Sequence, residues 1–181
     1  MRNEKAFTLV EMMFVVVLIA IVASIAVQNF REASLNNEIK SVAFTLGTAL
    51  GYAKDEAIMR RSFVTLCPSA NVNDANATCT SGGDWADGYI VFLDLDNNGV
   101  RADAETLLRV FPSMSRDQVT VRNLPDAVTF LPTGFRSGGS SVIEARIGIA
   151  TESGEATVVD TSKFHFQLNI AENGTFKILV K

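Results

Sequence analysis

The feature that most constrains this chain is a long apolar run near its amino terminus. Residues 7–27 make up 21 positions, and only Thr8, Glu11 and Ser24 among them are not apolar. A run of this length is long enough to cross a lipid bilayer as a helix. A charged side chain in such a run disfavours insertion by roughly 2.5–3.5 kcal/mol at mid-bilayer and by less near its edge. The position of the Glu11 carboxylate inside the apolar run therefore requires an explanation.

The residues around the run indicate an orientation. Arg2 and Lys5 precede it, so the positive-inside bias leaves the short amino-terminal tail in the cytoplasm and the rest of the chain across the membrane. The small residues of "AIVASIA" also allow a cleaved secretory signal peptide as an alternative. Glu11 is atypical of such a signal.

The helical pattern continues beyond the apolar run. No proline occurs between Asn29 and Arg61, and apolar residues recur at helical spacing. This stripe consists of Ile39, Val42, Ala43, Leu46, Ala49, Leu50, Ala53, Ala57 and Ile58. We therefore expect one helix from Phe7 to Arg61, apolar all round over residues 7–27 and amphipathic over residues 28–61. Such a helix is typical of a permanent part of the protein.

The segment "KAFTLVEMMFVVVLIAIVASIAV" resembles the amino terminus of type IV pilins and type II secretion pseudopilins. The resemblance implies that residues 1–6 are a leader peptide, which a prepilin peptidase cuts between Ala6 and Phe7 before the new amine of Phe7 is methylated. Most relatives have glycine at the position of Ala6, so we expect slower cleavage here. The resemblance also implies that Glu11 neutralises the terminal amine of a neighbouring subunit. A lone carboxylate in lipid either protonates or finds a cation, and staggered helices supply one.

After Arg61 the pattern changes to short strand-like runs, which make residues 62–181 a β-rich head. They include "SFVTL", "GYIVFL", "TLLRVF", "VTVRNL", "AVTFLP", "VIEARIGIA", "ATVVD", "FHFQLNI" and "TFKILV". Asn173-Gly174 between the last two predicts a tight hairpin. The sequence thus predicts an α+β fold, in which the long helix packs on an antiparallel sheet.

Composition argues against several functional classes. The chain carries 16 basic and 20 acidic residues, a net charge of −4, which disfavours nucleic acid as the main partner. Its one histidine, His165, alternates with apolar residues in "KFHFQLNI" and is expected on the wetter face of a strand. No nucleophile–base pair or cofactor fingerprint accompanies it. We therefore expect the protein not to be an enzyme.

The two cysteines, Cys67 and Cys79, enclose the polar, turn-rich loop "PSANVNDANAT". In an oxidising periplasm we expect them to form a disulfide, which would contribute roughly 3 kcal/mol by restricting the unfolded chain. A metal pair is the alternative, and it lacks a second cluster of cysteine or histidine ligands.

The stretch "LCPS…C…DWADGYIVFLDLDNNGVRADAETLLRVF" resembles the GspH/FimT/FimU branch of minor pilins and pseudopilins. In that branch a pair like Asp84-Trp85 enters a strand. With the amino terminus, the resemblance covers about residues 1–112. DNA-binding pilins of the FimT kind carry Gly-Arg-x-Arg near their end, but this chain ends "NGTFKILVK". Its candidate DNA-contacting arginines are scattered along the sequence: Arg116, Arg122, Arg136 and Arg146.

The segment "DLDNNGVRADAE" matches the oxygen-ligand and turn positions of a twelve-residue calcium loop. The candidate ligands are Asp94, Asp96, Asn98 and Glu105, with Gly99 at the turn. However, the element before the loop is a strand and not a helix, and Asp-Asn-Asn-Gly is also an ordinary hairpin turn. Calcium is therefore the only cofactor that the sequence suggests, and the alternative is none.

Together these features predict a minor pilin or H-type pseudopilin. This would be a single-pass inner-membrane protein, with a cytoplasmic amino terminus and a periplasmic head, that enters a type IV pilus or type II secretion pseudopilus at or near its tip and primes assembly. The implied partners are other pilin subunits, the prepilin peptidase, an inner-membrane assembly platform and membrane lipid. A DNA-uptake pilin is the alternative, although nucleic acid is an unexpected partner without the Gly-Arg-x-Arg motif.

Overall fold

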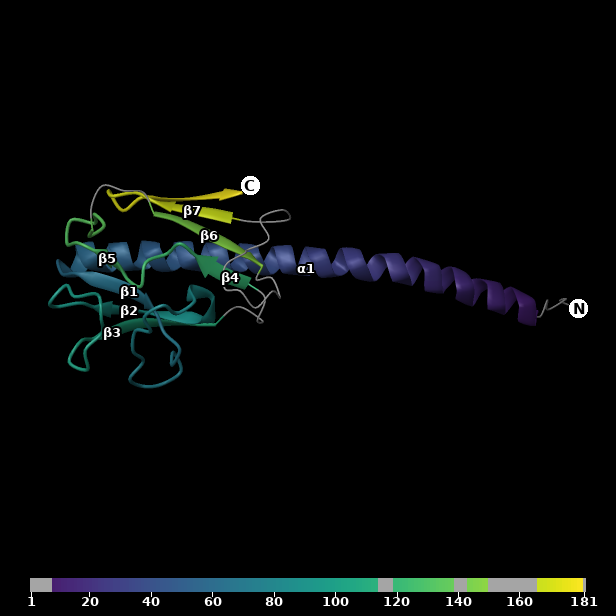
Figure 1. Cartoon of the computed structure of the whole chain (residues 1–181), viewed down its shortest axis with the longest axis horizontal. Coiled ribbons are helices and arrows are strands. Elements are labelled where there is room, and N and C mark those ends of the chain that lie inside the picture. Colours follow the sequence, from purple (N-terminus) through teal and green to yellow (C-terminus); the bar gives the residue numbers. More distant parts are fainter. Residues whose placement is uncertain (1–7, 114–118, 139–142, 150–165, 181) are drawn as a thin grey trace, which may run out of the picture. The chain divides into compact units, whose positions relative to one another are not determined.

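The computed structural model describes residues 8–113, 119–138, 143–149 and 166–180. It divides into two compact units, Met1–Asn37 and Glu38–Lys181, the second of which is called the head below. Helix α1, Leu9–Arg60, runs through both units (Figure 1). The predicted strand "ATVVD" and His165 lie outside the described residues.

In the first unit, α1 presents exposed apolar side chains. Every side chain from Thr8 to Ser24 is exposed. Among the described residues, no helix meets both the length and the hydropathy expected of a membrane-crossing segment.

In the head, α1 buries one face. The predicted stripe from Ile39 to Ala57 is at most 4% exposed, whereas Ile58 is 44% exposed. The helix ends where Arg61 adopts a positive φ of 53° and the amide of Ser62 donates to the carbonyl of Ala57 at 3.3 Å. A left-handed residue of this kind ends many helices, although glycine is the usual choice.

The strands form two antiparallel sheets. The first has the order β3-β2-β1-β5 and the second the order β4-β6-β7-β8. The strands of the first sheet are β1, Val64–Pro68; β2, Gly88–Leu93; β3, Leu107–Pro112; and β5, Val128–Phe130. Those of the second are β4, Val119–Arg122; β6, Ile143–Ile149; β7, Phe166–Ile170; and β8, Phe176–Val180. The predicted α+β class is therefore correct, with the strands divided between two sheets.

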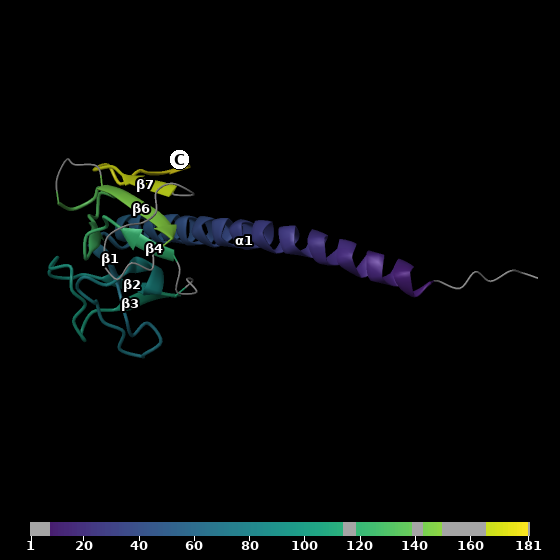
Figure 2. The ribbon, with the colours of Figure 1, turned by 45° about the vertical axis from the view of Figure 1, so that its right-hand side comes forward.

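The main core lies where the head segment of α1 meets both sheets. It joins the helical stripe to apolar side chains of both sheets, including Val91 and Phe130 from the first and Ile147 and Leu168 from the second. Figures 1 and 2 show β6 and β7 on one side of α1 and β2 and β3 on the other. The α1 glycines allow β8 to approach, because a Cβ at Gly47 would lie 3.3 Å from Ile178.

Strands β1, β2 and β5 of the first sheet are buried on both faces, whereas the edge strand β3 is only partly buried. Along β2, Tyr89 and Val91 belong to the main core, and Ile90 and Phe92 belong to a second cluster with Cys67. This explains why β2 reads as a continuous apolar run, because a strand covered on both faces loses the alternation of apolar and polar residues. Burial also raises the pKa of the Tyr89 phenol above its usual range.

Candidate assembly segment and head surfaces

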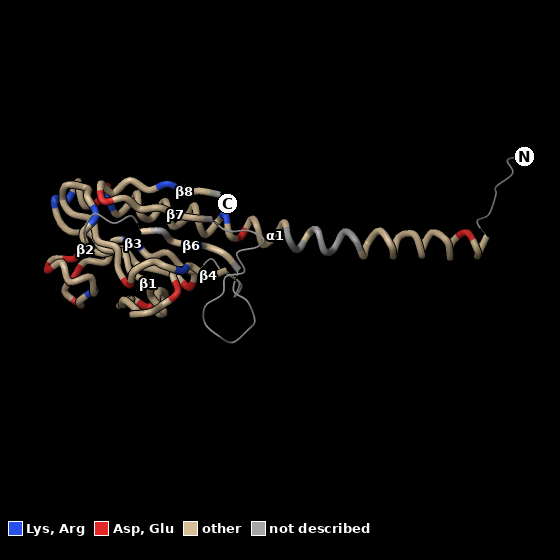
Figure 3. The backbone as a smooth tube through the Cα atoms, turned by 45° about the horizontal axis from the view of Figure 1, so that its top comes forward, with Lys and Arg blue, Asp and Glu red and all other residues tan. Residues whose placement is uncertain are grey.

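Glu11 lies in the first turn of α1, among exposed apolar residues. Its amide donates to Thr8 Oγ1 at 3.3 Å, which caps the start of the helix. Val10, Met12 and Phe14 around it are 73%, 54% and 67% exposed. Figure 3 shows this part of α1 with almost no charged residues. Ala6 and Phe7, where cleavage and methylation are predicted, lie outside the described residues.

Cys67 and Cys79 form a disulfide, with a Cα–Cα distance of 5.4 Å. Cys67 is fully buried at the end of β1, and Cys79 packs against the same cluster. The enclosed loop is organised by Asn71, whose Oδ1 accepts hydrogen bonds from the amide of Thr78 at 2.9 Å and the hydroxyl of Ser69 at 3.0 Å. The predicted pairing is confirmed, and it closes a structured loop.

Residues 94–105, called the acidic turn below, connect β2 to β3 and are organised by Asp94. This carboxylate is fully buried. Its Oδ1 accepts from the amide of Asn98 at 3.0 Å, and its Oδ2 accepts from the amide of Gly99 at 3.0 Å and the hydroxyl of Thr65 at 2.7 Å. Gly99 has a φ of +79°, a conformation that suits glycine. Asp94 thus acts as the internal acceptor around which the turn folds.

The other predicted calcium ligands are close to Asp94. Carboxylate oxygens of Asp94, Asp96 and Glu105 all lie within 4.8 Å of one another. Glu105, which is 5% exposed, accepts from the amides of Leu95 at 2.7 Å and Ala102 at 2.9 Å. The side chain of Asn98 accepts from the amide of Val100 at 2.7 Å. The structure therefore brings together an oxygen-rich cluster whose carboxylates also hold the backbone of the turn.

The acidic turn is attached to the disulfide loop. Arg101 Nη1 donates to the carbonyl of Ala77 at 2.7 Å, and Cys79 Sγ lies 3.8 Å from the carbonyl oxygen of Gly99. The disulfide loop and the acidic turn therefore contact each other.

Sequence reasoning missed the polar residues beneath the turn. Thr65 on β1 bonds Asp94 and also lies 2.6 Å, oxygen to oxygen, from Thr129 on β5. The three side chains form a buried chain of hydrogen bonds across the first sheet. Their separations of 29 and 64 residues leave no local pattern that could reveal them.

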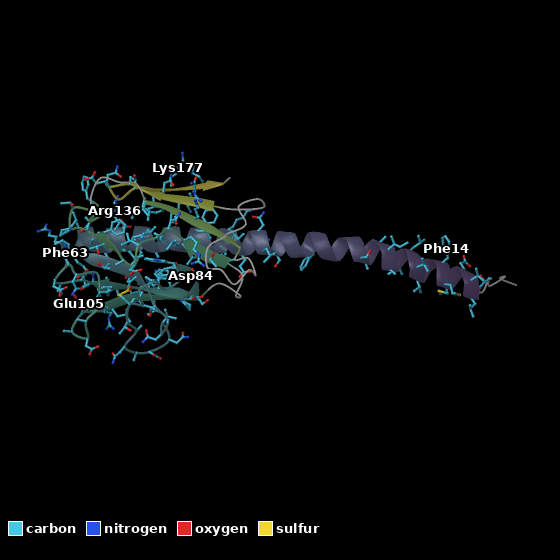
Figure 4. The ribbon with its side chains drawn as sticks, viewed as in Figure 1. Phe14, Phe63, Asp84, Glu105, Arg136 and Lys177 are labelled. Atoms are coloured by element: carbon cyan, nitrogen blue, oxygen red, sulfur yellow. A yellow bond between two sulfur atoms is a disulfide. The ribbon has the colours of Figure 1, made fainter. Side chains whose placement is uncertain are left out.

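The pair Asp84-Trp85 connects the two sheets. Asp84 caps the short 3-10 helix η1, Trp85–Asp87, by accepting from the amide of Ala86, and the same Oδ1 accepts from the amide of Val121 on β4 at 2.9 Å. Trp85 Nε1 donates to the carbonyl of Pro125 at 3.2 Å. Figure 4 shows Asp84 beside the second sheet, well away from Glu105. As predicted, Asp84 and Trp85 lead into a strand, β2. In addition, Asp84 links this segment to β4 of the second sheet.

A second polar contact lies close to this bridge. The carboxylate of Asp126 accepts from the hydroxyl of Ser81 at 2.6 Å and the amide of Gly82 at 3.0 Å. These hydrogen bonds lower the pKa of Asp126, because they favour its charged form.

The predicted arginines differ in their surroundings. Arg136 is 7% exposed, and its backbone amide donates to the carbonyl of Glu172 at 2.8 Å. Arg122 and Arg146 are exposed, and they lie directly opposite each other on β4 and β6. Arg116 lies outside the described residues.

Comparison with protein families decides the family. The family described as "Type II transport protein GspH" matches residues 43–163, and the "Prokaryotic N-terminal methylation motif" matches residues 1–27. The chain belongs to the GspH family. The GspH match extends well beyond residue 112, where the resemblance in the sequence ended. No curated protein sequence matches the chain.

The solved structure of a type IV minor pilin shows the same fold as this GspH-family chain. The type IV minor pilin FimU of Pseudomonas aeruginosa superposes with a TM-score of 0.55 at 19% identity, covering 79% of this chain and 89% of FimU. The minor pseudopilin EpsH of Vibrio cholerae gives a TM-score of 0.48 at 12% identity, covering 79% of this chain and 97% of EpsH. The alternative of a DNA-uptake pilin is not favoured by these findings.

Proposed function

We propose that this GspH-family protein is a minor pilin or H-type pseudopilin, a structural subunit without catalytic activity. It enters the inner membrane as a single-pass protein with a cytoplasmic amino terminus and a periplasmic head. From there it is incorporated at or near the tip of a type IV pilus or type II secretion pseudopilus, where it helps to prime assembly. Its partners are other pilin subunits, the prepilin peptidase, the inner-membrane assembly platform and membrane lipid.

The observation that carries this proposal is the exposed apolar surface of α1 from Thr8 to Ser24, with Glu11 inside it. An apolar surface this long is unfavourable in water and needs lipid or other helices around it. Lipid satisfies the apolar side chains but not the carboxylate. A neighbouring subunit whose methylated Phe7 amine pairs with Glu11 satisfies both, which explains why the acid lies where it does.

Substitution of Glu11 tests the role in assembly. In the native bacterium, we expect Glu11→Ala to reach the membrane at the wild-type level and to be incorporated into sheared filaments at least tenfold less. Ser24→Ala, another polar residue of the run, is the matched control and should be incorporated normally. Normal incorporation of Glu11→Ala would contradict the proposed amine pairing.

A deletion strain identifies the machine. Twitching motility, protein secretion and DNA transformation are measured in parallel. We expect loss of twitching or of secretion, according to the filament that the subunit serves. Loss of transformation with normal piliation and secretion would instead support a role in DNA uptake.

The finer proposal for the acidic turn is a calcium ion held by Asp94, Asp96, Asn98 and Glu105. It is supported by three carboxylates within 4.8 Å, a concentration of negative charge that a divalent cation would relieve. We expect millimolar calcium to raise the melting temperature, and a chelator to reverse the rise. Glu105→Gln should abolish this response. An unchanged melting temperature of the wild type would contradict calcium binding.

A further inference from the structure

Two arginines that are 24 residues apart in the sequence become neighbours in the second sheet. Arg122 on β4 and Arg146 on β6 are register partners in an antiparallel pair, and both are exposed. They are called the arginine pair below. Across the part of the chain that the structure describes, no hydrogen bond or ion pair joins either guanidinium to another residue.

This arrangement does not serve folding. Side chains directly opposite each other on antiparallel strands have Cβ atoms about 4.5–5.5 Å apart, and like charges at this distance destabilise the pair of strands. The inward-facing neighbours Val121, Ala145 and Ile147 are at most 5% exposed, and they already hold β4 and β6 to the core. The charges of Arg122 and Arg146 weaken the pairing of β4 with β6. A role in binding a partner accounts for their presence.

The chemistry of the arginine pair fits carboxylates. Each guanidinium is a planar fork of N–H donors that matches a carboxylate in a bidentate manner. Both side chains are also exposed, and β4 is an edge strand among the strands that the structure describes. Nonspecific binding of nucleic acid usually relies on many phosphate contacts. Two arginines in a chain of net charge −4 therefore fit a protein partner better than they fit nucleic acid.

The head also carries acidic residues of the kind that would complement the arginine pair. Residues 62–108 carry seven acidic residues and a single basic one, Arg101, and four of the seven are exposed: Asp74, Asp87, Asp96 and Asp103. Figure 3 shows the acidic residues gathered around the loops next to β1, β2 and β3. Figure 4 places Glu105 of the acidic turn far along the head from Asp84, whose carboxylate holds Val121 next to the arginine pair. The exposed carboxylates of Asp74 in the disulfide loop and Asp103 in the acidic turn are thus the kind of group that fits an arginine pair.

We propose that the arginine pair is an intersubunit contact that receives carboxylates from the head of a neighbouring filament subunit. This inference rests on the proposed function, because it needs a filament in which heads lie side by side. It adds a second electrostatic contact, in the head, to the pairing at Glu11.

The decisive variant is Arg122→Glu. It replaces two like charges by an opposite-charge pair with Arg146, so the melting temperature of the purified full-length protein in detergent should stay equal or rise. In the native bacterium we expect incorporation into sheared filaments to fall at least tenfold, with wild-type levels in the membrane. Lys177→Glu, at an exposed position of β8 in the same sheet, is the charge-matched control and should be incorporated within twofold of wild type.

A second variant separates charge from geometry. The double change Arg122→Lys with Arg146→Lys keeps both charges but loses the bidentate forks, so we expect incorporation between those of wild type and Arg122→Glu. If the wild type and Arg122→Glu both enter filaments normally, the proposed arginine contact is overturned, but the proposed function is not. Failure of the wild type to enter filaments would overturn the proposed function itself.

Nucleic acid is tested as the other occupant. Fluorescence anisotropy of a short duplex DNA probe is measured against the purified full-length protein. We expect no difference between wild type and Arg122→Glu. Binding that is strong in the wild type and lost in Arg122→Glu would overturn the proposal in favour of a nucleic-acid site.

Discussion

At the scale of single residues, Asp94 shows how a buried charge can organise a surface. Its carboxylate has no exposed area and accepts hydrogen bonds from two backbone amides and one hydroxyl. A buried charge is tolerated when its lone pairs are satisfied in this way, and removing such an acceptor leaves donors unpaired. The shape of the acidic turn therefore depends on one side chain beneath it.

We expect Asp94→Asn to lower the free energy of unfolding by about 1–3 kcal/mol. The NH₂ group of the asparagine is a donor, and it would face backbone amides or a hydroxyl that also donate hydrogen bonds. Chemical denaturation of the full-length protein measures the loss. Asp103→Asn is the matched control, since this carboxylate of the acidic turn is exposed and lies outside the cluster of Asp94, Asp96 and Glu105, and its effect should stay within about 0.5 kcal/mol. Equal effects of the two changes would contradict the central role of Asp94.

At the scale of elements, two glycines lie where α1 packs on β8. Gly47 and Gly51 lie one turn apart on α1 and face Ile178 and Phe176 of β8. A Cβ at Gly47 would lie 3.3 Å from Ile178 Cδ1, whereas one at Gly51 would lie 3.6 Å from the ring of Phe176. The two positions therefore differ in how easily they accept a methyl group.

We expect Gly51→Ala to raise the free energy of unfolding by up to about 1 kcal/mol, because alanine favours the helix and its methyl group makes ordinary contact. Gly47→Ala should gain less, since Ile178 must move. Thermal unfolding compares both variants with the wild type. A marked loss of stability in Gly51→Ala would contradict the ordinary contact expected between this methyl group and Phe176.

The elements themselves were largely predictable. The helical stripe from Ile39 to Ala57 and the strand runs follow local periodicity, and the hairpin at Asn173-Gly174 follows turn chemistry. The division into two sheets was not predictable, because it depends on which distant strands pair. β1, for example, pairs with β5 across more than sixty residues of sequence. Local patterns carry no information about such partners.

At the scale of the whole head, α1 and both sheets share one core. Among the described residues, polar contacts help to join the sheets: Asp84 and Trp85 bond to Val121 and Pro125, and the amide of Arg136 bonds to Glu172. A shared core with bridges of this kind favours unfolding as a single cooperative unit.

Trp85, the one tryptophan of the chain, can test this cooperativity. We expect its fluorescence and the hydrogen-exchange protection of β7 to be lost at the same denaturant concentration, because η1 and the second sheet separate together. Both are measured on the full-length protein in detergent. Loss of β7 protection at a clearly lower denaturant concentration would contradict a single cooperative head.

A candidate site could be predicted from the sequence where its residues are close along the chain, and not where strand pairing alone brings them together. The disulfide and the cluster of Asp94, Asp96 and Glu105 are close in sequence, so spacing alone revealed them. Arg122 and Arg146 looked scattered, because their proximity exists only in the register of β4 with β6. Thr65 was hidden for the same reason, since only sheet pairing brings it to Asp94.

The closed disulfide loop has a practical consequence for following the subunit in cells. Residues 73–76, at its tip, are all exposed, while Cys67, Cys79 and Asn71 fix its base. Extra residues inserted at such a tip lengthen the loop at little entropic penalty and need not disturb the core. An epitope tag placed there would label the head while leaving α1, the acidic turn and the arginine pair in their native sequence.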